Sequence, residues 1–134
     1  MVEADAAAVA ALSAELGYPA GAADIAARMA RVAGRADHAV WVHPDGEALL
    51  GFIHVQAMDR IISTPYAEIL HLVVSDRARR RGVGRALVDQ ALAWTRERGF
   101  AHLRVRSNTL RDQSHAFYLA LGFTRAKTQH VYTL

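Results

Sequence analysis

Residues 74–86 read VSDRARRRGVGRA, and this stretch is the most informative part of the sequence. An apolar run ends at Val74, a loop with five arginines between Arg77 and Arg85 follows, and a helical pattern begins at Gly82. Backbone N–H groups at a helix start are unpaired and carry the positive end of the helix dipole, so they bind phosphates well. Glycine leaves no Cβ in the way of a bulky phosphate group. The stretch therefore predicts a strand, a phosphate-binding turn and a helix.

The segments on both sides of this turn predict a β-α-β unit. A strand is predicted over Ala67–Val74, a helix over Gly82–Arg98 and an alternating strand over Ala101–Arg106. The helix carries its apolar residues on one face: Val83, Leu87, Ala91 and Trp94. Two consecutive strands joined by a crossover helix lie parallel in the same sheet.

The remaining periodicity completes the order α-α-β-β-β-α-β-α-β. Further helices are predicted over Val2–Leu16, Asp24–Val32 and Asp112–Leu121, and further strands over His38–His43, Ala48–Gln56 and Thr128–Leu134. The turn Pro44-Asp45-Gly46 joins two of these strands into a hairpin. This order predicts an α/β fold with a mixed central sheet flanked by helices. No repeat or linker divides the chain, so we expect residues 1–134 to form a single domain.

Composition excludes several kinds of site. The chain has no cysteine, which excludes disulfides, thiolate zinc sites and a cysteine nucleophile. Its seven histidines show no metal-ligand spacing, so no metal site is expected. No apolar run approaches the roughly 20 residues of a membrane span, and the N-terminus lacks the pattern of a secretion signal. We therefore expect a cytoplasmic protein with no membrane partner.

A second motif, SHAFYLALGF at residues 114–123, links the phosphate turn to a family. The turn is neither a Walker loop, since no Gly-Lys-Ser/Thr follows, nor a dinucleotide fingerprint, since Leu87 stands where the third glycine would be. Arg79-x-x-Gly82-x-Gly84 instead resembles the acyl-CoA signature of the GNAT superfamily of N-acetyltransferases. Residues 114–123 resemble the closing helix of that superfamily, which ends in Tyr-x-x-x-Gly-Phe. The resemblance spans roughly residues 48–134 and implies transfer of the acetyl group of acetyl-CoA to a primary amine.

Two positions depart from the family pattern. Members usually begin with a strand, whereas this sequence starts almost directly in a predicted helix. Many members carry an asparagine seven residues before the tyrosine, where this sequence has Arg111, and Asn108 lies three residues earlier. The resemblance implies pyrophosphate on the loop amides, the pantetheine arm beside the third strand, and further contacts from the closing helix. The implied cofactor-binding residues are Leu72, Val73, Val74, Arg79, Arg80, Arg81, Gly82, Val83, Gly84, Arg85, Asn108, Arg111, Phe117 and Tyr118.

The family chemistry implies direct attack of the amine in a ternary complex. Tyr118 is the implied general acid for the departing thiolate. Glu68, six residues before Val74 on the third strand, resembles the base of histone-acetylating members. His71 is the rival base, and strand alternation places it on the opposite sheet face from Glu68 unless a bulge intervenes. Either residue, or water, remains open as the base.

Acceptor, assembly and competing functions remain open at this point. Tyr18, Glu15 and Asp24 lie in the segments that form the acceptor side of the family and would suit a cationic small-molecule amine. Two unpaired sheet edges are expected, which predicts a homodimer through the C-terminal strand around Gln129–Leu134.

The competing functions are a nucleic-acid-binding module, because the arginine loop would contact phosphates, and an acyl-CoA-binding domain without catalysis. The compact cluster and the acidic residues on its helix favour CoA over nucleic acid.

Overall fold

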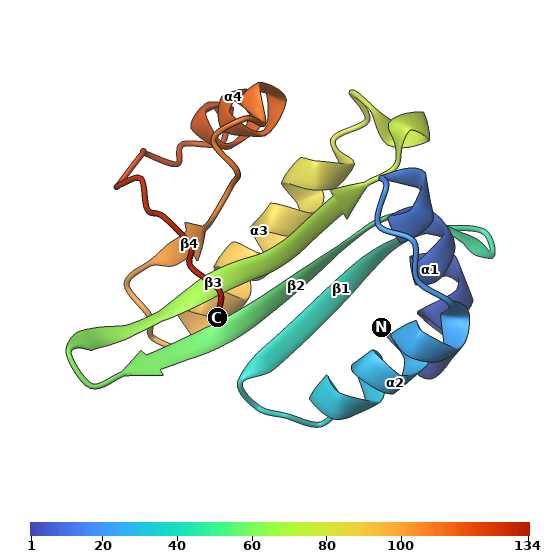
Figure 1. Cartoon of the computed structure of the whole chain (residues 1–134), viewed down its shortest axis with the longest axis horizontal. Coiled ribbons are helices and arrows are strands. Elements are labelled where there is room, and N and C mark those ends of the chain that lie inside the picture. Colours follow the sequence, from blue (N-terminus) through green and yellow to red (C-terminus); the bar gives the residue numbers. More distant parts are fainter.

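The computed structural model describes all 134 residues and shows a four-stranded sheet between layers of helices (Figure 1). The elements are the short 3-10 helices η1 (Glu3–Asp5) and η2 (Asp76–Ala78), the helices α1 (Ala6–Glu15), α2 (Ala22–Val32), α3 (Val83–Glu97) and α4 (Asp112–Ala120), and the strands β1 (His38–Asp45), β2 (Ala48–Arg60), β3 (Ser63–Val74) and β4 (Leu103–Val105).

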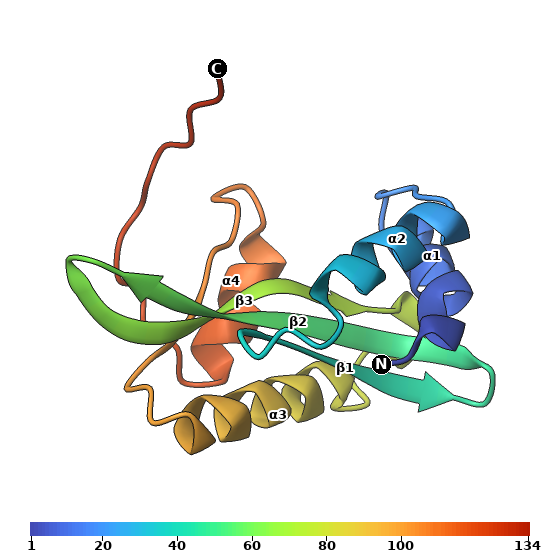
Figure 2. The same ribbon diagram turned by 90° about the horizontal axis from the view of Figure 1, so that it is seen from below.

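The sheet has the strand order β1-β2-β3-β4. β1, β2 and β3 form an antiparallel meander, whereas β3 and β4 are parallel and joined through α3. The predicted β-α-β unit and the mixed sheet are therefore confirmed. Figure 2 shows α3 below the sheet and α1 and α2 above it.

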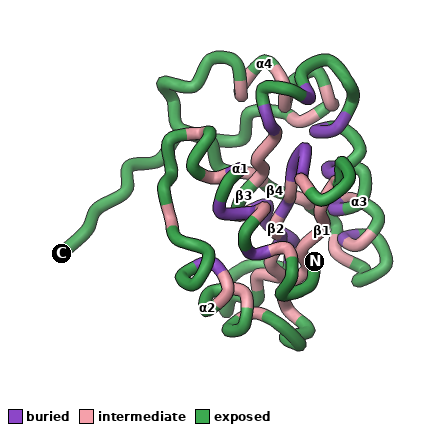
Figure 3. The backbone as a smooth tube through the Cα atoms, turned by 90° about the vertical axis from the view of Figure 1, so that its right-hand side faces the viewer, coloured by how far each residue is buried: buried purple, intermediate pink, exposed green.

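Each face of the sheet has its own apolar core. Ile53, Val55 and Ile69 meet Leu87 and Ala91 of α3 on one face. On the other face, α1 and α2 bury a second cluster against β2, which comprises Ala6, Val9, Ala10, Leu12, Ile25 and Leu49. Figure 3 shows the buried segments concentrated where the strands pass between the helices, with exposed backbone around them. Two-sided burial explains why the middle of β3 is nearly continuously apolar.

A bulge at Leu70 changes which side chains share a face. His54 pairs with His71, but Val55 pairs with Ile69, so Leu70 is an extra residue on β3. A bulge reverses the alternation of side chains beyond it. Directly opposed residues point to the same face, and Glu68 opposes Gln56 on the same side of β2 as His54. The expectation that Glu68 and His71 lie on opposite faces is therefore wrong, because the bulge puts both on the face covered by α1 and α2.

β3 and β4 separate where the short strand β4 ends. Pairing joins residues 67–69 of β3 to residues 103–105 of β4 and goes no further. Beyond Ile69, the edge of β3 that faces β4 has no strand partner as far as Val74. The sheet therefore opens into a fork between β3 and the chain that leads to α4 (Figure 1).

The predicted C-terminal strand over Thr128–Leu134 does not form. No helix or strand follows α4, and the end of the chain extends away from the domain (Figure 2). Val131, Tyr132 and Leu134 are almost fully exposed. β-branched and aromatic residues favour strands only when a neighbouring strand takes up their hydrogen bonds and covers their side chains, and the tail has no such neighbour.

The helices are also too short or too polar to cross a lipid bilayer.

Candidate active site

The loop between β3 and α3 presents a row of free backbone N–H groups. Arg80 and Gly82 adopt left-handed backbone conformations, with φ of 62° and 74°. Such alternation turns successive N–H groups toward one side and forms an anion-binding concavity. The first intrahelical bond of α3 runs from Ala86 N–H to Gly82 O at 2.9 Å, so Val83, Gly84 and Arg85 have N–H groups without an acceptor in the chain. The backbone of this loop therefore presents the free N–H groups that a phosphate-binding turn requires.

Four of the five loop arginines are free to meet an anion. Only Arg79 is ion-paired, with its Nη2 2.8 Å from Asp76 Oδ1. The others, which are Arg77, Arg80, Arg81 and Arg85, are exposed and contact no carboxylate. Arg80 keeps its left-handed conformation without the steric freedom of glycine, and such strain is concentrated at ligand-binding loops.

The start of the loop is anchored by Glu15 at the end of α1. The fully buried Ser75 donates its hydroxyl to Glu15 Oε1 at 2.8 Å, and the N–H of Asp76 donates to the same oxygen at 2.9 Å. Ser75 Oγ in turn accepts the N–H of Arg77 at 3.2 Å. Glu15 is thus a structural tie, and the expectation that it faces an acceptor amine does not hold.

Gly84 brings the closing helix α4 against the start of α3. A Cβ at Gly84 would lie 2.9 Å from Phe117 Cζ and 3.1 Å from Phe117 Cε2. This glycine therefore serves packing as well as anion approach. Phe117 packs against the main core, and its ring contacts the ring of Tyr118 edge-on at 5.2 Å between centroids. Phe117 therefore contacts both Gly84 in the first turn of α3 and Tyr118, the predicted acid.

A cleft of about 720 Å³ opens at the fork between β3 and β4. Its wall contains five of the predicted site residues, which are Leu72, Val73, Asn108, Arg111 and Tyr118. His71, the rival base, also lines the cleft, as do residues of α1 and α2. The structure thus brings the strand end, the chain before α4 and the first two helices around one space.

Tyr118 lines this cleft, and its phenol is protonated at neutral pH. Its half-buried ring lies edge-on to Phe123 at 5.5 Å, and its hydroxyl makes no hydrogen bond within the chain. Burial raises the pKa of Tyr118 above its usual value near 10, and the Arg111 guanidinium opposes this shift in part. The hydroxyl is therefore a donor at neutral pH.

Asn108 and Arg111 organise the chain before α4. Asn108 Oδ1 accepts the N–H of Leu110 at 2.9 Å, which closes a local side-chain turn. The carbonyl of Asn108 accepts the N–H of Arg111 at 3.0 Å and lies 2.8 Å from His115 Nε2. The Arg111 guanidinium stacks over the ring of Tyr18 at 5.5 Å, so it closes the cleft toward the loop between α1 and α2.

Glu68 is buried beside the cleft and paired. Its Oε1 lies 2.7 Å from Arg106 Nε, and its side chain is only 7% exposed. Arg106 lines the cleft, whereas Glu68 does not. Arg106 therefore lies in the cleft wall, whereas the Glu68 carboxylate that pairs with it does not reach the cleft.

Three histidines from three adjacent strands form a row across the sheet. His38 Nδ1 lies 2.8 Å from His54 Nε2, and the rings of His54 and His71 are 5.9 Å apart. Burial and the neighbouring His38 and His71 lower the pKa of His54 to about 4. Burial also lowers the pKa of His71. Both rings are neutral at pH 7 and so can accept a proton.

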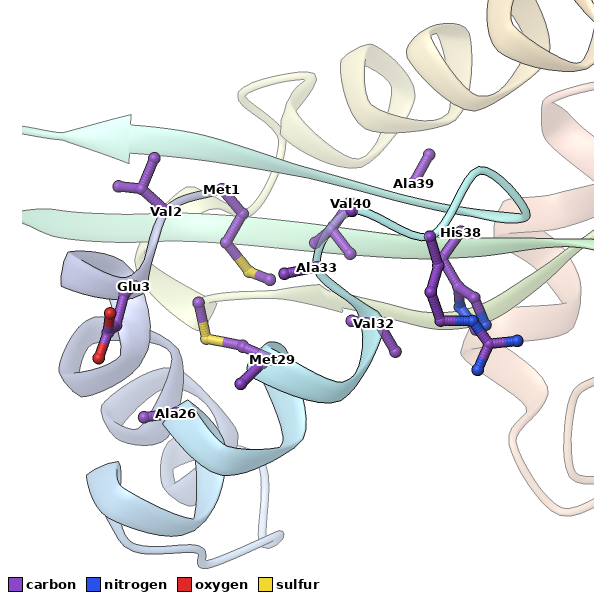
Figure 4. Close-up of a pocket in the computed structure, with 13 residues that line it drawn as sticks. Met1, Val2, Glu3, Ala26, Met29, Val32, Ala33, His38, Ala39 and Val40 are labelled. Carbon is purple, nitrogen blue, oxygen red and sulfur yellow. The ribbon is translucent and has the colours of Figure 1, made fainter.

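A second, smaller cavity of about 460 Å³ lies at the His38 end of this row. Met1, Met29, Val40 and His38 are among its lining residues, together with parts of α2 and the start of β1 (Figure 4). His38 Nε2 is buried there without a hydrogen-bond partner and lies 3.7 Å from Asp37 Oδ2. The histidine row thus runs from the large cleft to the surface near Asp37.

Sequence reasoning missed His38 and His54. Val40 lies opposite His54 with His38 two residues away, but a register shift between His43 and Pro44 separates this pairing from the hairpin turn, so the turn alone does not predict that the two rings meet. The participation of His71 depends on the bulge, for which the sequence carries no clear signal.

This geometry agrees with a family match. A family model described as Acetyltransferase (GNAT) family matches residues 8–123. The chain belongs to this family. The resemblance of the two sequence motifs is thereby confirmed, and the match extends upstream through α1 and α2.

Among curated relatives, human N-acetyltransferase 8 is 26% identical to this GNAT chain over 86 residues. That alignment covers 63% of this chain and 38% of the relative, so the chain matches well under half the length of that protein. Solved structures share the fold. The aminoglycoside 6'-N-acetyltransferase AAC(6')-IG of Acinetobacter haemolyticus superposes with a TM-score of 0.86 at 16% identity, covering 100% of this chain and 94% of that one. The aminoglycoside N-acetyltransferase AAC(6')-Iy in complex with CoA gives 0.88 at 17% identity, covering 100% and 91%.

Proposed function

We propose that this GNAT protein transfers the acetyl group of acetyl-CoA to a primary amine by direct attack within a ternary complex. The observation that carries the proposal is the fork at the end of β3, where the free strand edge and Tyr118 line one cleft, while the free N–H groups at Val83–Arg85 lie just beyond the end of this strand, at the start of α3. Each feature suits one part of acetyl-CoA. The N–H groups and arginines suit the phosphates, and the free edge of β3 at Leu72–Val74 suits the amide-rich pantetheine arm.

The reaction needs three proton transfers: the ammonium loses one proton before attack, the nitrogen loses a second after attack, and the thiolate gains one. The amine must reach the thioester carbonyl without its extra proton, and the C–S bond must break as the new C–N bond forms. Tyr118 donates its phenolic proton to the departing thiolate and regains one from solvent. The base at the other side of the cleft passes both protons lost by the nitrogen to solvent, and Tyr118 takes one back, so that one proton is released for each acetyl group transferred from acetyl-CoA to an ammonium form of the amine.

We propose His71 as that base in preference to Glu68. His71 lines the cleft and its lowered pKa keeps it neutral, whereas Glu68 is paired with Arg106 and lies behind the cleft wall. The contact between His38 and His54 bears on the tautomer of His54, whose ring lies 5.9 Å from the ring of His71. Asp37 beside His38 Nε2 favours a proton on that nitrogen, which leaves His38 Nδ1 to accept from His54 Nε2–H. His54 Nδ1 then carries no proton and can accept one.

Binding to acetyl-CoA and to duplex DNA separates the enzyme from the nucleic-acid-binding alternative. We expect acetyl-CoA to raise the melting temperature, and we expect the shift to shrink with added salt because phosphate contacts are screened. Replacing both Arg80 and Arg81 by Gln should weaken acetyl-CoA binding, whereas Arg125→Gln in the tail serves as the matched control. Stabilisation by DNA but not by acetyl-CoA would reject the proposal.

A further inference from the structure

The wall of the large cleft is basic and carries no acidic side chain. Four arginines line it: Arg28 and Arg31 of α2, Arg106 after β4 and Arg111 before α4. The histidines His54 and His71 are the other titratable residues, apart from Tyr118 and Tyr18, and no aspartate or glutamate is present in the lining. Arg106 is paired with Glu68, so a polycationic acceptor would meet the unpaired positive charges of Arg28, Arg31 and Arg111 in this cleft.

The acidic residues expected to face the acceptor are engaged elsewhere. Glu15 accepts hydrogen bonds from Ser75 and Asp76, and Asp24 lies outside the cleft lining in the first turn of α2. Glu68 forms an ion pair with Arg106. The expectation that Glu15 and Asp24 prepare the site for a cationic amine is therefore wrong, and only Tyr18 of that set reaches the cleft.

Arg28 and Arg31 have no other partner. Neither lies within ion-pair distance of a carboxylate, and both are exposed. Because they are three residues apart on α2, their side chains lie on the same helix face and can hold one anion together. They are separate from the phosphate turn, since α2 covers the opposite face of the sheet from α3 (Figure 2). That turn already has four free arginines of its own.

The rest of the wall is largely apolar. Met29, Val32, Phe52 and Leu70 are among its lining residues. An acceptor that fits this wall has an apolar body with an amine at one end and an anion at the other.

We infer that the acceptor is a small amine that also carries an anionic group, of the amino-acid type, and that Arg28 and Arg31 bind the anion. This inference rests on the proposed acetyl transfer. It separates the chain from the amines in the names of its structural neighbours, because aminoglycosides are polycations. Guanidinium pairs that bind a carboxylate bidentately supply both affinity and orientation, which leaves the amine at the far end of the acceptor facing the thioester.

A matched series of amines tests the inference. The probes are 5-aminopentanoate, pentylamine and 1,5-diaminopentane, which share one primary amine and differ in the charge of the other end. Their binding is measured by calorimetry on the full chain saturated with CoA, and their acetylation is measured with acetyl-CoA. We expect 5-aminopentanoate to bind at least about 10-fold more tightly than the diamine, the scale of one charge-assisted hydrogen bond.

Charge reversal of the two α2 arginines tests whether they bind the anion, and charge reversal elsewhere provides the control. The double variant Arg28→Glu with Arg31→Glu should weaken 5-aminopentanoate by about 10- to 100-fold and reverse the preference toward the diamine, with acetyl-CoA binding unchanged. Arg96→Glu, on the exposed side of α3, changes charge away from the cleft and should leave the order of the probes as in the wild type.

Tighter binding of the diamine by the wild type, equal binding of the three probes, or failure of 5-aminopentanoate to bind overturns the inference. An acceptor preference that survives the double charge reversal also overturns it. Failure of the proposed function appears differently, as the absence of acetyl-CoA binding by the wild-type chain.

Discussion

Gly84→Ala tests whether the packing of two helices positions the proposed acid. The new Cβ would lie 2.9 Å from Phe117 Cζ, whereas carbon atoms in contact prefer about 3.5–4.0 Å. Phe117 must therefore retreat by roughly 0.5–1 Å, and Tyr118 follows it on the same helix. Overpacking of this kind costs about 1–3 kcal/mol of unfolding free energy. Misplacement of a reacting group by about 1 Å lowers the rate by up to roughly 100-fold.

Two assays separate stability from positioning. Urea denaturation gives the free energy of unfolding, and thiol release from acetyl-CoA with an excess of amine gives kcat. We expect both quantities to fall in Gly84→Ala. In the double variant Gly84→Ala with Phe117→Leu, the smaller side chain leaves room for the Cβ, so a substantial part of kcat should return.

Gly46→Ala is the matched control. Gly46 has φ of 62° in the β1–β2 turn with open space around it, so alanine there strains the backbone without moving α4. It should lose roughly 1 kcal/mol of stability with kcat unchanged. Wild-type turnover by Gly84→Ala, or no recovery in the double variant, would refute the account of Tyr118 positioning.

Four further predictions follow from the site and the tail. Tyr118→Phe removes only the hydroxyl and should lower kcat roughly 10- to 1000-fold with acetyl-CoA affinity retained; an unchanged kcat would mean that water protonates the thiolate. His71→Gln should lower kcat most below the pKa of the amine and shift the pH–rate profile, and a larger effect of Glu68→Gln would return the base to Glu68. Stability should fall as pH is lowered from about 6.5 to about 4, because the folded pKa of His54 is about 4 against 6.5 for the free side chain and the unfolded chain takes up the proton first. The upper limit is about 3 kcal/mol, and solvent screening of this half-buried ring reduces it to about 1–2 kcal/mol; His54→Gln should flatten the dependence measured by urea denaturation, and an equal slope in both proteins would contradict it. The exposed tail should pair with a second copy, so that light scattering finds a dimer for the full chain and a monomer for a chain that ends at Lys127; a monomeric full chain would refute this assembly.

Local signals predicted the phosphate turn because its structure depends on neighbouring residues. Gly82 takes a left-handed φ at the start of α3, and the helix face that begins at Val83 is periodic over its whole length. The hairpin turn is equally local, although it consists of Gly46 and Glu47, and the predicted turn residues Pro44 and Asp45 belong to β1. Such features follow from backbone sterics and helical spacing, and they are readable in one sequence.

The acceptor side of the site depends on contacts between distant segments. The bulge at Leu70 is a property of the pairing between β2 and β3, and it decides that His71 shares a face with Glu68. Glu15 is matched to Ser75, sixty residues away, so its role as a structural tie has no local signature. The tail from Thr128 has strand-forming composition, but a strand requires a partner edge that the chain itself does not supply. The interpretation of His71, Glu15 and the tail differs between sequence and structure because each depends on contacts with distant segments, which a local pattern does not contain.

Acetyl transfer in a ternary complex is tested most directly by following both products and the protein together. The full chain is incubated with acetyl-CoA alone and then with acetyl-CoA and the three amine probes, while free thiol, N-acetylated amine and the intact mass of the protein are measured. We expect that thiol release requires the amine, that thiol and acetylated amine form in equal amounts, and that the protein mass stays unchanged with acetyl-CoA alone. An acetylated protein in the absence of amine, or thiol release without an N-acetylated product, would contradict it.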